Sequence, residues 1–184
     1  APVTLTIQQD ANARVELSMR DTWSGSGALS VVKDGPGHLT LASLRHTNTS
    51  SLGWTGTTDV HAGTLQFGDP SNFAFGTSKV TVASGATFIL YRTDASYVLP
   101  YELSGPGTVR LRGSGVTNEG SYYIQRSNPT FSGSLIVESG SRFVPQNPLA
   151  AGTSEITVLS GGGSEILFGS GVLANSWRIA GSGW

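Results

Sequence analysis

Carboxylates and histidines are the residues of this chain whose types could support metal binding or acid–base chemistry. Spacings of 25 residues separate Asp34 from Asp59 (59 − 34), Asp69 from Asp94 (94 − 69) and Asp94 from Glu119 (119 − 94). If one turn of the fold takes about 25 residues, such carboxylates stack on one face, where they would bind Ca²⁺ or share a proton. Coincidences of this kind also arise by chance among twelve acidic residues, and stacked like charges repel. The spacing is therefore weak support for a site, and we predict no metal and no cofactor.

Other catalytic patterns are missing from the sequence. His38, His46 and His61 show neither the H-x-H nor the H-E-x-x-H spacing of metal ligands. No serine lies in a G-x-S-x-G elbow, and the Gly35-Pro36-Gly37 turn is not followed by the Lys-Ser/Thr of a phosphate-binding loop. We therefore expect no catalytic residues and no enzymatic activity.

Aromatic and arginine residues give the second indication of a site. Tyr122 and Tyr123 lie in a segment, about 112–128, that departs from the repeat described below, and Arg110, Arg112 and Arg126 are close in sequence. We interpret that segment as an inserted surface loop, the kind of place where a scaffold carries its function. These five residues are the predicted ligand contacts, with sugar rings stacking on the tyrosines.

The elements that would position these residues are short strands. Alternating runs such as His38–Leu41, Thr64–Phe67 and Lys79–Val82 each follow a glycine turn, a pattern typical of half-buried β-strands. No stretch supports a helix of ten residues. Gly63, Gly85, Gly140 and Gly161 are predicted to occupy corners where φ is positive or where strands crowd together. The side chains expected to point inward are Leu39, Leu41, Leu65, Phe67, Val80 and Val82.

An internal repeat organises the chain. Gly105-Pro106-Gly107 follows Gly35-Pro36-Gly37 after 70 residues (105 − 35), whereas Gly133 follows Gly56, and Gly140 follows Gly63, after 77 (133 − 56 and 140 − 63). We ascribe the difference to the inserted loop. The expected divisions within one segment are the end of a preceding repeat or first coils (1–23), repeat one (24–103), repeat two (104–180) and the start of a third (181–184).

Repeats that bury their apolar face by stacking on their neighbours form solenoids. About three coils of roughly 25 residues fit one repeat, so we predict an all-β parallel β-helix of about seven coils. A β-sandwich is the alternative, because it too is built from many short strands.

One family matches several of these motifs. The first copy contains a glycine-rich turn with an L-x-L run at Lys33–Leu41, an aromatic-x-G-x-T element at Trp54–Thr58, and a V-x-x-G-T-L element at Val60–Phe67. The second copy is weaker, with Asn128–Gly133 and Gly140–Phe143 in the corresponding places. Together they resemble the autotransporter-associated β-strand repeat over most of residues 24–168. The resemblance implies a right-handed parallel β-helix in a large bacterial cell-surface or secreted protein.

Composition limits the partners. Charged residues make up 12% of the chain and its net charge is −1, which gives no electrostatic footprint for nucleic acid. No apolar run reaches the length of a membrane helix, and cysteine is absent. We expect a non-enzymatic structural or adhesive segment, extracellular or on the bacterial cell surface. Its expected contacts are neighbouring coils or domains of the parent chain, head-to-tail copies of itself, and glycans. The alternatives are a glycan-binding module of a larger secreted carbohydrate-active protein and a polysaccharide-cleaving β-helix enzyme.

Overall fold

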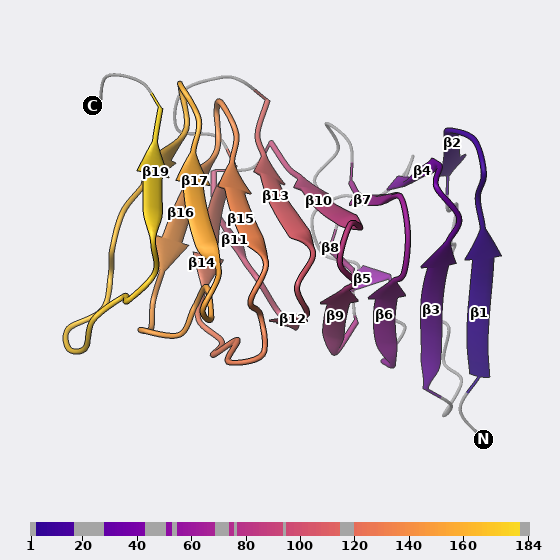
Figure 1. The fold of residues 1–184 in the computed structure, drawn as a ribbon, viewed down its shortest axis with the longest axis horizontal. Helices are drawn as coiled ribbons and strands as arrows, with labels where there is room; N and C mark the ends of the chain where they lie inside the picture. The colour runs from indigo at the N-terminus through magenta and orange to yellow at the C-terminus, as the bar shows by residue number, and fades with distance from the viewer. Residues whose placement is uncertain are drawn as a thin grey trace.

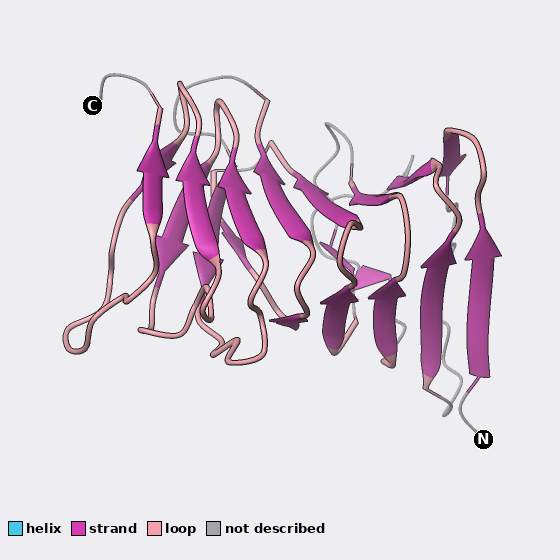
Figure 2. Ribbon diagram, in the orientation of Figure 1, coloured by secondary structure: helices cyan, strands magenta, loops and turns pink. Residues whose placement is uncertain are grey.

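Parallel β-strands joined by turns and loops build the described structure, a computed structural model (Figures 1 and 2). It describes residues 3–16, 28–42, 51–52, 55–68, 74–75, 77–93, 95–114 and 120–180, and none of them is helical. All pairings between named strands are parallel and join strands that are not consecutive in the chain, as in a right-handed parallel β-helix. The β-helix prediction is thereby confirmed, and the β-sandwich, which needs antiparallel sheets, is excluded.

The strands form two long sheets and two short ones. The five-stranded sheet consists of β1 (Val3–Gln8), β3 (Leu29–Asp34), β6 (Thr57–Val60), β9 (Lys79–Val82) and β12 (Glu102–Ser104). The eight-stranded sheet consists of β2 (Ala13–Glu16), β4 (His38–Ala42), β7 (Thr64–Phe67), β10 (Thr87–Tyr91), β13 (Thr108–Arg112), β15 (Ser134–Val137), β17 (Glu155–Val158) and β19 (Trp177–Ile179). A third face carries a four-stranded sheet of β11 (Tyr97–Val98), β14 (Ser121–Ile124), β16 (Arg142–Pro145) and β18 (Gly163–Ser164), and a two-stranded sheet of β5 (Ser51–Leu52) and β8 (Ala74–Phe75).

The length of a coil varies along the eight-stranded sheet. Leu39 is paired with Leu65 across one coil, and Phe88 is paired with Val109 across a shorter one (65 − 39 against 109 − 88). The eight-stranded sheet nevertheless stays in register from β2 to β19. The coil length is therefore close to the expected value but is not constant, so carboxylates at a constant spacing do not always stack.

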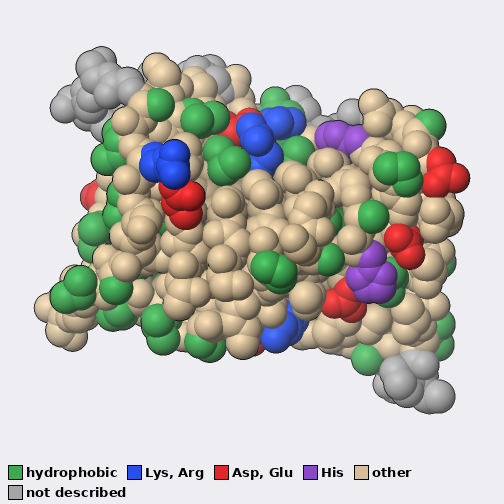
Figure 3. Space-filling view, viewed as in Figure 1, with side chains coloured by type: hydrophobic (Ala, Val, Ile, Leu, Met, Phe, Trp, Pro, Cys, Tyr) green, Lys and Arg blue, Asp and Glu red, His purple; other side chains and the backbone are tan. Residues whose placement is uncertain are grey.

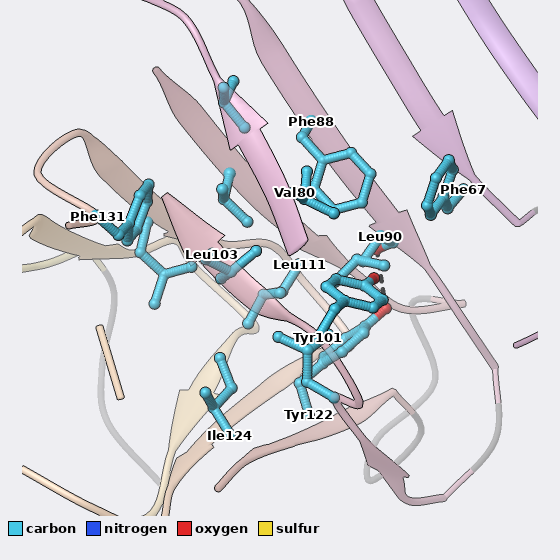
Figure 4. Packing of buried hydrophobic residues seen from close by; sticks show 14 of the residues in the cluster. Phe67, Val80, Phe88, Leu90, Tyr101, Leu103, Leu111, Tyr122, Ile124 and Phe131 are labelled. Atoms are coloured by element: carbon cyan, nitrogen blue, oxygen red, sulfur yellow. Dashed lines mark hydrogen bonds between the residues drawn. The ribbon is translucent and has the colours of Figure 1, made fainter. Parts of the chain in front are cut away.

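The core is a single cluster that extends from Leu29 to Val158. All six side chains predicted to point inward are buried: Leu39, Leu41, Leu65, Phe67, Val80 and Val82. Aromatic rings also pack in the core (Figure 4). The ring centres of Phe67 and Phe88 are 4.9 Å apart and those of Phe88 and Tyr101 are 6.3 Å apart, both pairs in edge-to-face arrangement. Burial of these alternate residues holds neighbouring coils together.

Lys33 is a charged residue at an inward position. Its side chain is buried, and the ammonium donates to the carbonyl oxygens of Asp34, Gly35 and Ala62 at 2.9, 2.8 and 3.1 Å. These bonds use all three N–H groups of a charged lysine. Burial lowers the pKa of Lys33, although the nearby carboxylates of Asp34 and Asp10 act in the opposite direction. The lysine thus closes the corner between β3 and β4 and joins it to the corresponding corner of the next coil at Ala62.

Glycine turns make the sharp corners. Gly63, Gly85, Gly140 and Gly161 have φ of 65°, 79°, 73° and 79°, as the sequence predicted. At three of these corners a backbone bond closes the turn, for example from the Ala86 nitrogen to the Ala83 oxygen.

The Gly56 turn and its repeat at Gly133 are not equivalent in the structure. The Gly56 turn leads into β6 of the five-stranded sheet, whereas the Gly133 turn leads into β15 of the eight-stranded sheet. The glycine–proline–glycine turns that begin at Gly35 and Gly105 both lead from the five-stranded to the eight-stranded sheet. The predicted inserted loop at about 112–128 is therefore wrong in part, because residues 121–124 form β14, a regular strand of the third face. The same sequence motif, a glycine turn followed by a strand, therefore occurs at two different corners of the coil, before β6 and before β15.

Candidate functional site

The outward face of the eight-stranded sheet carries regular rows of mostly polar side chains. Strand alternation turns every second residue of each strand away from the core, and the parallel register aligns these residues across strands. The middle of one row, which we name the hydroxyl row, is formed by half-buried Thr64, Thr87, Thr108 and Ser134. The same row continues to His38 at one end and to Glu155 at the other. The adjacent row contains, in order, Thr40, Gln66, Ile89, Arg110, Ile136, Thr157 and Arg178.

Five residues near the middle of this face make a connected group, which we name the arginine cluster: Gln66, Tyr91, Arg110, Arg112 and Glu138. The Arg110 Nε donates to Glu138 Oε1 at 2.5 Å, and the Arg112 Nε donates to Glu138 Oε2 at 2.6 Å. A further bond runs from Arg112 to Gln66 Oε1 at 3.3 Å. Figure 3 shows basic side chains grouped with an acidic one on this face. One carboxylate therefore holds two guanidinium groups of the same strand.

The charges of the arginine cluster are coupled. Burial opposes ionisation of Glu138, but the hydrogen bonds and charges of Arg112 and Arg110 outweigh it and lower its pKa below the ordinary 4.5. The bond to Glu138 in turn raises the pKa of Arg112. Burial, together with the charges of Arg112 and Lys33, lowers the pKa of His38 at the side of the cluster. At neutral pH the cluster holds two positive charges and one negative charge.

Two parts of the arginine cluster remain accessible. Among the described residues, no group hydrogen-bonds to the two terminal nitrogens of Arg110, whose side chain is 32% exposed. Tyr91 is half-buried on the same outward face, with the Arg112 guanidinium carbon 5.9 Å from the centre of its ring. A planar guanidinium fork can bind a carboxylate, and an aromatic ring on the same face can stack against a sugar ring.

The structure separates the five predicted ligand contacts. Arg110 and Arg112 lie together on β13, but Tyr122, Tyr123 and Arg126 belong to β14 and the turn after it, on the third face of the coil. The prediction of Tyr122 in an exposed loop is wrong. Its side chain is fully buried, and its hydroxyl lies 2.8 Å from the Leu90 oxygen and 2.6 Å from the Arg112 oxygen. Alternation then turns Tyr123 outward, where it is half-buried, and Arg126 is exposed.

The carboxylate spacing does not produce a stacked pair at Asp34 and Asp59. Asp59 of β6 is paired with Val32, so Asp34 lies further along β3 than the residue that faces Asp59. Asp34 instead approaches His61, with 3.9 Å between its Oδ2 and the histidine Nδ1. Asp69, Asp94 and Glu119, like His46, lie outside the described residues. Within the described ranges no group of three or more His, Cys, Asp or Glu side chains is placed to hold a metal ion.

No family model, curated protein or solved structure matches this chain. The arginine cluster is therefore interpreted from its own geometry alone. Among the described residues there is no helix long and apolar enough to cross a membrane.

Three members of the arginine cluster were not among the ligand contacts predicted from the sequence: Gln66, Tyr91 and Glu138. A signal for Glu138 was present, because it follows Arg112 at the spacing of one coil, the same spacing that separates Ser134 from its partner Thr108 (138 − 112 and 134 − 108). Gln66 and Tyr91 occupy the polar positions of alternating runs, which reveals their outward direction but not their neighbours.

Proposed function

We propose that this chain is a non-enzymatic structural or adhesive segment of a bacterial cell-surface or secreted protein. The observation that carries the proposal is the eight-stranded sheet, a parallel ladder that continues from β2 to β19 over a core packed with side chains. Such a solenoid places its chemistry on its outer faces, because its interior is occupied by its own side chains.

The proposed location is extracellular. It is supported by the resemblance of the glycine-turn motifs to autotransporter-associated repeats and by the low content of charged residues, 12%. Both features fit a rigid spacer that carries binding surfaces away from a cell.

The experiment is protease shaving of intact cells of the source organism, followed by mass spectrometry. We expect peptides from residues 28–180 to be released from intact cells or found in the medium, with a cytoplasmic protein as the control. Release only after lysis would contradict the surface location. Formation of new reducing ends or unsaturated sugars from a polysaccharide panel by the purified chain would contradict the non-enzymatic role.

A glycan-binding module is the second candidate function, and the arginine cluster is the observation that favours it. Its half-buried guanidinium group, half-buried tyrosine ring and neighbouring hydroxyl row are groups that bind sugars through stacking and directed hydrogen bonds.

A further inference from the structure

Arg110 is fixed at one nitrogen and open at the other two. Its Nε is bonded to Glu138, which orients the guanidinium plane on the outward face without occupying its terminal N–H groups. Glu138 itself is only 14% exposed, and its two oxygens already accept bonds from Arg110 and Arg112. The fork of Arg110 is thus preorganised, and one positive charge of the arginine cluster is not compensated within it.

The surroundings of Arg110 combine apolar and hydroxyl groups. Ile89 and Ile136 flank it in its own row, and Thr108, in the hydroxyl row, precedes it on the same side of β13. Neighbouring strands are about 4.8 Å apart, so these rows extend past Arg110 along the solenoid axis. An elongated ligand could therefore contact several strands at once.

We propose that the arginine cluster binds the carboxylate groups of an acidic polysaccharide lying along this face. The carboxylate is favoured because both guanidinium groups already bind one, Glu138, and a planar carboxylate matches the planar fork of arginine. The half-buried ring of Tyr91 offers an apolar surface for a sugar ring. This inference assumes one part of the proposed function, namely that the chain contacts its ligands through its outward surface.

Three polymers with one backbone test the ligand class: dextran, carboxymethyl-dextran and dextran sulfate. Binding of the purified chain is measured by biolayer interferometry at low salt and again at about 0.5 M salt, where a Debye length of about 4 Å screens exposed charges. We expect carboxymethyl-dextran to bind, more weakly at high salt, and plain dextran not to bind. Equal binding of dextran, tighter binding of dextran sulfate at matched charge density, or no binding of any polymer would overturn the proposal.

Matched variants locate the site. Arg110→Gln removes the open fork and is expected to weaken binding of carboxymethyl-dextran about tenfold or more, since hydrogen bonds to charged groups are the strong ones. Arg142→Gln removes a comparable arginine, 28% exposed and paired with Glu165 on the third face, and is expected to leave binding unchanged. Equal losses in the two variants would show that only net charge matters and would overturn the assignment.

Glu138→Gln is expected to change binding in the opposite direction from Arg110→Gln. It removes the negative charge that repels a ligand carboxylate, while the glutamine oxygen can still accept the Arg110 Nε bond, so binding should become several-fold tighter, a result that partial unfolding would not produce. Unchanged or weaker binding by a variant that retains its β-sheet circular dichroism would contradict the proposal. The proposed structural role is tested separately by the location of the chain on cells, so failure of the polymer experiments leaves that result unaffected.

Discussion

Tyr122 reaches across the interior of the solenoid to Leu90, and its hydroxyl lies 2.8 Å from the carbonyl oxygen at the end of β10. The same hydroxyl lies 2.6 Å from the carbonyl oxygen of Arg112, so one side chain of the third face joins two strands of the eight-stranded sheet. Figure 4 shows the rings of Tyr101 and Tyr122 together in the core, with their hydroxyls toward Leu90.

Removing that hydroxyl should destabilise the fold. Tyr122→Phe is expected to lower the free energy of unfolding by about 1 kcal/mol, because buried carbonyl groups lose their donor. Urea unfolding followed by circular dichroism measures the change. The control is Tyr91→Phe on the outward face, which should change stability by less than about 0.5 kcal/mol. Equal effects in the two variants would argue against an anchoring role for Tyr122.

Two glycine corners should differ in their tolerance of a side chain. Gly85 has φ of 79° and no atom within 4 Å of a built Cβ, so Gly85→Ala should cost about 1–2 kcal/mol, for the left-handed conformation alone. At Gly63, with φ of 65°, a Cβ would lie 2.5 Å from the Gly37 oxygen. Gly63→Ala should therefore cost about 1–3 kcal/mol more than Gly85→Ala. Thermal unfolding of the two variants measures the difference in stability. Equal melting temperatures would contradict the close approach of the Gly63 corner to the Gly37 oxygen.

The stability contributed by Glu138 should depend on pH. Its pKa is lower in the folded chain than its ordinary 4.5, so between the two values the unfolded chain binds more protons. The contribution is therefore complete above the ordinary pKa and is lost as the pH falls through the folded pKa. We expect Glu138→Gln to cost about 1 kcal/mol at neutral pH, for a partly exposed pair, and almost nothing in strong acid.

The measurement is the difference in unfolding free energy between the parent chain and Glu138→Gln from neutral pH down to strong acid. Glu165→Gln, in the more exposed pair with Arg142, is the matched control, with an expected cost below about 0.5 kcal/mol. A difference for Glu138→Gln that stays constant over the whole range would show that the ion pairs do not stabilise the fold.

Ile179 should mediate self-association of the chain. It is paired with Val158, an inward-facing position, yet its side chain is 69% exposed, and Val172 is 78% exposed. Apolar surface of this kind favours contact with another copy. Sedimentation velocity should show concentration-dependent association, and Ile179→Lys should weaken it by placing a charge in the contact, whereas Thr87→Lys in the hydroxyl row should not. A monomer at every concentration would contradict this prediction.

Local geometry was predictable from this sequence, and the assignment of segments to faces was only partly so. The alternation of Leu39 with Leu41 and of Leu65 with Phe67 correctly indicated the buried side of each strand. A strand–turn–glycine–strand motif, however, specifies a corner without specifying which two faces meet there. The motif at Gly140 therefore resembles that at Gly63, although one leads to β16 of the third face and the other to β7 of the eight-stranded sheet.

Only part of the arginine cluster could be predicted from the sequence, for a related reason. Arg110 and Arg112 are both polar residues of one alternating run, so their common outward direction followed from the pattern. The exact coil length decides which residue lies beside them, and this length differs between the coil from His38 to Thr64 and the coil from Thr87 to Thr108 (64 − 38 against 108 − 87). For the same reason the constant spacing of the carboxylates placed Asp59 beside Val32 rather than beside Asp34.

The direction of the inter-strand hydrogen bonds has a mechanical consequence. The strands cross the long axis of the molecule and the described chain runs from one end to the other, so the ladders lie along that axis (Figure 1). A pulling force applied at the two ends loads these ladders in series, and the weakest junction gives way first. Each coil that peels away would release about 70–90 Å of chain, since every residue of an extended chain spans about 3.3–3.6 Å. Under tension the rod would therefore lengthen in steps and dissipate the load coil by coil.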